Sequence, residues 1–199
     1  MKKIIPCAIA IALCGCGQTR VVDLQNQKDV SSMQDVMELE YRDWTNTAES
    51  MTKSMIESGA LVQKPVIAIA NIKNDTMQRF DTDILTKKIR TTLLKSGKAQ
   101  IATAFSGEDT TTNKMRDQRS NDEYNQETFA KKGTLVAPNM SLSGKMLQRN
   151  LKLQSGLFSS VDTRVEYYLQ LTLTDLKTGL SVWEDEQPIV KEGDHAPTW

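Results

Sequence analysis

Three cysteines and one histidine are the most reactive side chains of this sequence, and their positions limit its chemistry. Cys7, Cys14 and Cys16 lie within the first sixteen residues, whereas His195 lies near the opposite end. A catalytic triad or a histidine-based metal site needs partners that a single histidine in the tail does not have. The ten glycines are scattered and form no phosphate-binding loop. These residues therefore predict a protein that is not an enzyme and that uses no metal and no cofactor.

The stretch around Cys16 indicates a thiol that carries lipid. Two lysines precede an apolar run at residues 4–13, which has the length of a signal-peptide core and is too short to span a membrane. The run ends in "LCGC", which resembles the bacterial lipobox. In lipoproteins cleavage falls just before the last cysteine, here between Gly15 and Cys16, and acyl chains are added to that cysteine. The alternative is an ordinary apolar N-terminus with chance cysteines.

This pattern predicts four segments. Residues 1–15 form the signal peptide, residues 16–42 the lipidated cysteine with a short polar tether, residues 43–191 the globular domain, and residues 192–199 a flexible tail. By the enteric sorting rule, an aspartate directly after the lipidated cysteine retains a lipoprotein in the inner membrane. This sequence has Gly17 at that position. The predicted location is therefore the periplasmic face of the outer membrane.

The acidic groups and one tyrosine pair are the remaining candidates for a site. The run from Glu184 to Glu186 could bind a cation, but nothing convergent accompanies it, which favours a solvated strand end. Two aspartates, at positions 81 and 83, fall at a predicted helix start, where acids cap and complement the dipole. Tyr167 and Tyr168 are strand neighbours that must face opposite sides, so one is core and the other is a candidate partner contact.

The first half of the domain predicts two helices and two strands. Asn46 and Glu49 form a capping-box-like start just after Trp44, and a methionine-rich face follows as far as Gly59. Residues 66–72 are continuously apolar, which predicts a strand buried on both faces. The residues "KNDT" predict a turn, and a helix then runs from position 81 to a Ser-Gly end at 96–97, followed by a strand at 99–105.

The second half of the domain predicts antiparallel strands. A helix near residues 122–132, closed by Gly133, leads into a strand that begins at Met140. Residues 164–176 alternate strictly between apolar and polar side chains, and Gly179 supplies the turn before the last strand. The connection between the first two of these strands is expected around residues 155–156. The predicted fold class is α+β, an α/β sandwich with a mixed, largely antiparallel sheet and helices on its faces.

Three motifs follow one another along the domain. The first covers the strand–helix–strand unit, with Asn71 to Thr76, a Lys-Ile-Arg-x-x-Leu helix at residues 88–93, and Ser-Gly-Lys at 96–98. The second is "YYLQLTLTDLKTGLSVWEDEQPIVK", and the third is the tryptophan-led helix "DWTNTAESMTKSMIES". In these motifs, which keep their order over most of residues 43–191, the sequence resembles the LpoB family, the outer-membrane lipoprotein activators of penicillin-binding proteins.

The resemblance implies a domain similar to the N-terminal domain of TolB, carried on a lipid tether. It also implies a partner, a bifunctional class A penicillin-binding protein, whose glycan polymerisation and crosslinking the domain stimulates. Two departures are a tether without proline and "GTLV" at residues 133–136, where relatives have Gly-Ala-Asp-Tyr.

Composition bears on the alternatives to this function. Equal numbers of basic and acidic residues, 25 of each, argue against a nucleic-acid partner, and no small-molecule substrate is indicated. A structural accessory lipoprotein of an outer-membrane secretion or surface apparatus is the second hypothesis. A hydrolase with an unrecognised site is a third hypothesis, which the missing nucleophile disfavours.

Overall fold

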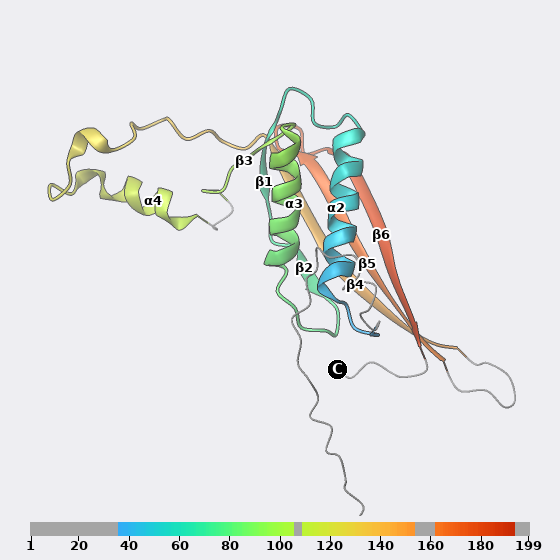
Figure 1. Cartoon of the computed structure of the whole chain (residues 1–199). Coiled ribbons are helices and arrows are strands. Elements are labelled where there is room, and N and C mark those ends of the chain that lie inside the picture. Colours follow the sequence, from blue (N-terminus) through green and yellow to red (C-terminus); the bar gives the residue numbers. More distant parts are fainter. Residues whose placement is uncertain (1–35, 106–108, 154–161, 194–199) are drawn as a thin grey trace, which may run out of the picture. The chain divides into compact units, whose positions relative to one another are not determined.

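Three long antiparallel strands, β4 (Met140–Leu153), β5 (Asp162–Asp175) and β6 (Ser181–Gly193), form the largest part of the sheet. The computed structural model describes residues 36–105, 109–153 and 162–193, and these belong to one unit (Figure 1). The alternation predicted for β5 is confirmed, because its odd-numbered side chains from Val165 to Leu173 are fully buried. Gly179 has a φ of 73° in the β5–β6 turn, as predicted. The predicted β4–β5 turn residues lie outside the described residues.

Three short strands complete the sheet on its other side. They are β1 (Val66–Ile69), β2 (Lys73–Asp75) and β3 (Gln100–Ile101). The strand order is β3-β1-β4-β5-β6, and β2 also pairs with β4. The β1–β3, β1–β4 and β2–β4 pairs are parallel, so the predicted mixed sheet is confirmed. The turn predicted at "KNDT" is wrong, because its first three residues form β2.

Two helices, α2 (Tyr41–Glu57) and α3 (Asp83–Ser96), lie side by side on one face of the sheet (Figure 1). The methionine-rich face of α2 is core, as predicted, and so is the apolar repeat of α3. Their fully buried apolar side chains are Ala48, Met51, Met55, Leu85, Ile89 and Leu93. Gly97 ends α3 in the left-handed conformation expected for a C-terminal cap.

The prediction of helices on both faces is wrong for the described residues, because the helices that pack on the sheet share one side. The prediction that residues 66–72 form a strand buried on both faces is wrong for the same reason. In β1, Ile67 and Ile69 point under the helices and are buried, whereas Val66 and Ala68 are half-buried on the other face.

The first helix has its N-cap six residues before the predicted cap at Asn46. Glu40 is its N-cap, and the Glu40 N–H donates to Asp43 Oδ2 at 3.0 Å in a capping box. Leu39, just before the cap, is 4% exposed, so the chain already contacts the core of the domain before the predicted boundary at residue 43. The last strand secures this start, because Lys191 Nζ lies 2.7 Å from Asp43 Oδ2.

The segment between β3 and β4 contains α4 (Thr110–Asp117) and two 3₁₀ turns, η1 (Gln118–Ser120) and η2 (Gln126–Thr128). The helix predicted at residues 122–132 is therefore wrong. Asn121 and Asn125 explain the difference, since each side-chain oxygen accepts the backbone N–H two residues later and so competes with helical hydrogen bonding. Asp109 caps α4 instead, accepting the N–H groups of the next helical residues.

We expect Glu49→Gln to weaken the domain slightly at neutral pH and to flatten its loss of stability in acid. Glu49 on α2 lies 2.7 Å from Lys88 Nζ of α3 and 2.9 Å from Lys53 Nζ. Hydrogen bonds from these two lysines lower the pKa of Glu49 from 4.5 to about 2. The stabilisation is therefore present above pH 4.5 and is lost as the pH falls towards 2.

For this partly exposed ion pair the expected loss is about 0.2–1 kcal/mol at pH 7. Urea unfolding at pH 7, 4 and 2.5 measures it, with Glu57→Gln at the end of the same helix as the control. An equal difference between wild type and Glu49→Gln at all three pH values would contradict this assignment.

Candidate partner-binding surface

The tyrosine pair divides between the two faces of β5, as predicted. Tyr167 is fully buried under α2, and its hydroxyl donates to the Met37 carbonyl oxygen at 3.3 Å. Burial, with the charges of Glu38 and Asp43, raises the pKa of Tyr167 well above its ordinary value. Tyr167 is therefore the core member of the pair, which leaves Tyr168 as the candidate partner contact.

Tyr168 lies on the opposite face, which α2 and α3 do not cover. Its hydroxyl donates to Glu166 Oε2 at 2.6 Å, and Arg149 Nη1 of β4 lies 4.0 Å from the same oxygen. The hydrogen bond to Glu166 raises the pKa of Tyr168. The ring is thus half-exposed but oriented, which favours binding because less side-chain entropy is lost on contact.

The surface around Tyr168 is here called the open face. It consists of the outward side chains of the three long strands, which are half-buried or exposed, and its central members are Ser143, Lys145, Leu147, Arg149, Glu166, Tyr168, Gln170, Thr172, Glu184, Glu186, Pro188 and Val190. Basic residues lie on β4 and acidic residues on β6. Gln170 Nε2 of β5 donates to Glu186 Oε2 of β6, so this hydrogen bond links the two strands through their side chains.

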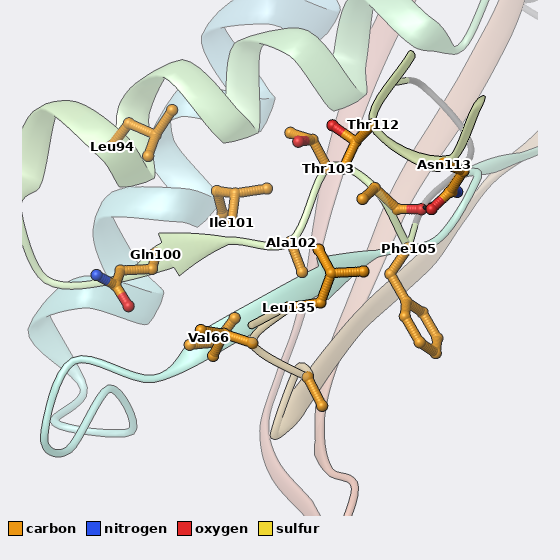
Figure 2. A pocket seen from close by; sticks show the side chains of 13 residues that line it. Val66, Leu94, Gln100, Ile101, Ala102, Thr103, Phe105, Thr112, Asn113 and Leu135 are labelled. Atoms are coloured by element: carbon orange, nitrogen blue, oxygen red, sulfur yellow. Dashed lines mark hydrogen bonds between the residues drawn. The ribbon is translucent and has the colours of Figure 1, made fainter. Parts of the chain in front are cut away.

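A second candidate surface is a groove of about 870 Å³ at the β3 edge of the sheet (Figure 2). Exposed apolar side chains line it, including Leu94 at 52%, Phe105 at 73% and Val136 at 69% exposure. The backbone N–H groups on the β1 side of β3 are already used in hydrogen bonds. Gln100 N–H donates to the Pro65 carbonyl, and Ala102 N–H donates to the Ile67 carbonyl. The lining residues include no titratable side chain, so the groove suits an apolar segment rather than acid–base chemistry.

The acidic candidates do not converge on a site. Glu184 and Glu186 lie on the open face, whereas Asp185 points to the helical side. Thr82 is the N-cap of α3, and Asp81 Oδ1 accepts the N–H of Asp83, the first helical residue, so both aspartates lie at the helix start as predicted. Among the described residues no group of three possible metal ligands is found. Cys16, Gly15 and His195 lie outside the described residues.

The described part of the chain also lacks any helix with the length and apolar character to cross a membrane. What it offers is a pair of surfaces: a polar sheet face with an oriented aromatic, and an apolar groove beside a sheet edge. These features define the class of α+β interaction domains.

The chain belongs to the LpoB family. The model of this family, described as peptidoglycan-synthase activator LpoB, matches residues 43–189, which confirms the resemblance seen in the three sequence motifs. Members of the family are activators of peptidoglycan synthases and are not themselves catalysts. The family is one of outer-membrane lipoproteins.

Solved structures with a similar fold include the LpoB C-terminal domains of Escherichia coli and Salmonella enterica. The first has 13% sequence identity and a TM-score of 0.46, and the match covers 74% of this chain and 98% of that domain. The second has 14% identity and a TM-score of 0.47 with the same coverage. The lipoprotein GNA1162 from Neisseria meningitidis has 11% identity and a TM-score of 0.39, covering 67% of this chain and 88% of its own. No curated protein matches.

Proposed function

We propose that this chain is anchored by lipid on Cys16 in the outer membrane and activates a bifunctional, class A penicillin-binding protein. The observation that carries the proposal is the family match over residues 43–189, together with the "LCGC" stretch that precedes it. An activator of this kind needs no chemistry of its own, because binding the active state of the synthase more tightly than the inactive state shifts the population. The likeness to the TolB N-terminal domain stays a prediction.

The reach of such an activator depends on how much chain separates lipid and domain. Burial of Leu39 and the start of α2 at Tyr41 limit the proposed tether to residues 16–35. At about 3.3–3.6 Å per residue, twenty residues span at most about 65–72 Å when fully extended. The docking surface of the synthase is therefore expected within the combined length of this tether and the domain from the outer membrane.

A polymerisation assay tests the function. The mature chain, purified in detergent, should raise the rate of glycan polymerisation by a class A synthase of its own organism. If it leaves every such synthase unchanged, the proposal is wrong, and an accessory lipoprotein of an outer-membrane apparatus becomes the better account. Co-purification then separates the two, with a synthase expected from the first and outer-membrane subunits from the second.

Tyr168→Ala should weaken synthase binding about tenfold, because rigid aromatic side chains near the centre of an interface carry much of its energy. Thr172→Ala, on the same face and strand, is the matched control and should bind like wild type. Titration of each variant against the synthase measures the effect, and circular dichroism checks that both variants are folded. Equal binding by wild type and Tyr168→Ala would remove the open face from the proposed contact.

A further inference from the structure

The open face carries opposite charges on its two outer strands. Strand pairing places Lys145 of β4, Gln170 of β5 and Glu186 of β6 in one row across the sheet. Lys73 of β2 is paired with Lys145 and adds to the basic side, and Glu184 adds to the acidic side one row away. Among the ion pairs formed by the described residues, none involves Lys145, Glu184 or Glu186.

The next row is apolar. Leu147, Tyr168 and Pro188 lie side by side on β4, β5 and β6. This row crosses the middle of the face and separates the Lys145–Glu186 row from the row that contains Arg149. The face therefore combines a central apolar row with basic side chains on β4 and acidic side chains on β6, so one copy can complement another when β4 lies over β6.

We propose that the open face binds a second copy of this chain. A two-fold axis parallel to β5 turns one face onto the other, so that β4 of each copy lies over β6 of its partner while every row keeps its height. Lys145 then meets Glu186 of the other copy, Leu147 meets Pro188, and the two Tyr168 rings meet near the axis. The two Glu166 carboxylates also meet near the axis, and Arg149 Nη1 of its own copy lies 4.0 Å from each of them. A two-fold axis across the strands would instead place β4 on β4 and β6 on β6, which brings like charges together and is disfavoured.

The size of the face sets the strength of this contact. Three strands about 4.8 Å apart and about twelve residues long, at about 3.4 Å per residue, give about 590 Å² per copy. The total of about 1,200 Å² is at the lower limit for specific interfaces. The association is therefore weak, depends on protein concentration, and weakens with salt because its charged pairs are exposed.

The inference goes beyond the proposed function and has a consequence for it. The second copy occupies the face that contains Tyr168, so a self-associated pair hides the surface proposed to meet the synthase. Local crowding of anchored chains would then compete with activation. The test below uses no synthase, so its outcome is independent of the polymerisation assay.

Sedimentation equilibrium of the full mature chain with Cys16→Ser, from micromolar to millimolar concentration, tests the proposal. We expect a monomer–dimer equilibrium that Lys145→Glu and Glu186→Lys each weaken at least tenfold. The combined variant should restore dimerisation, because it exchanges the two charges across the interface. Lys177→Glu, in the β5–β6 turn, is the matched charge control and should dimerise like wild type.

Two results would overturn the proposal. One is a wild-type chain that remains monomeric at millimolar concentration, in which case the open face serves other partners. The other is a dimer that the single variants do not weaken, or that the combined variant does not restore. Circular dichroism of each variant ensures that a loss of dimer is not a loss of fold.

Discussion

Leu171→Ala should lower the free energy of unfolding by about 2–5 kcal/mol, the range for truncating a buried leucine. Leu171 is fully buried in the middle of β5, and its β4 partner is Gly144. A Cβ on Gly144 would lie 2.6 Å from Leu171 Cδ2, so the leucine side chain fills the space above the bare glycine. Its removal leaves a cavity beside a residue that has no side chain to fill it, which favours the upper part of the range.

Urea unfolding of the mature chain with Cys16→Ser measures this loss. Thr172→Ala, the next residue on β5, changes a side chain on the open face and is the control, with an expected change within about 0.5 kcal/mol. A loss for Leu171→Ala as small as that of the control would show that β5 faces the opposite way.

Cys16→Ser should move the protein completely from the membrane fraction to the soluble fraction. The proposed anchor is lipid on this single thiol, and more than one acyl chain is needed for stable attachment. Without the thiol no chain is added, and the described domain contains no spanning helix to replace it. Cys7→Ser is the matched control, because Cys7 would leave with the signal peptide and its loss should not alter fractionation.

Mass spectrometry of the wild-type protein provides the complementary measurement. An acylated N-terminus beginning at Cys16 is expected. An intact, unmodified N-terminus would refute the anchor and would leave the domain assignment untouched, since residues 43–189 carry the family match.

The sequence correctly predicted those parts of the fold in which buried side chains recur at a regular spacing or in which a glycine marks a turn. The alternation in β5 and the four-residue spacing of Leu85, Ile89 and Leu93 correctly identified the buried positions. Gly97 and Gly179 correctly marked turns, because both need a positive φ that glycine adopts without strain. Each of these signals depends on residues that are close in sequence.

Contacts between distant residues could not be predicted in this way. β2 is exposed and polar, and its partners in β4 lie about seventy residues later, so nothing local distinguishes it from a turn. The start of α2 depends on an acidic capping box that Lys191 of the last strand completes. The open face was missed for a similar reason, because alternation shows which side of a strand is apolar but not what covers the other side.

The pairing of the first helix with the last strands has a consequence for how the protein matures. α2 packs against α3 and also against β5 and β6, so part of its apolar side stays uncovered until the end of the chain is present. Under the export that the proposed signal peptide implies, α2 and α3 leave the channel before the strands that bury them. The domain then folds only after β6 has crossed, and a holding chaperone would protect the two helices until that point. Chains truncated before β6 are expected to be degraded rather than to accumulate as partly folded intermediates.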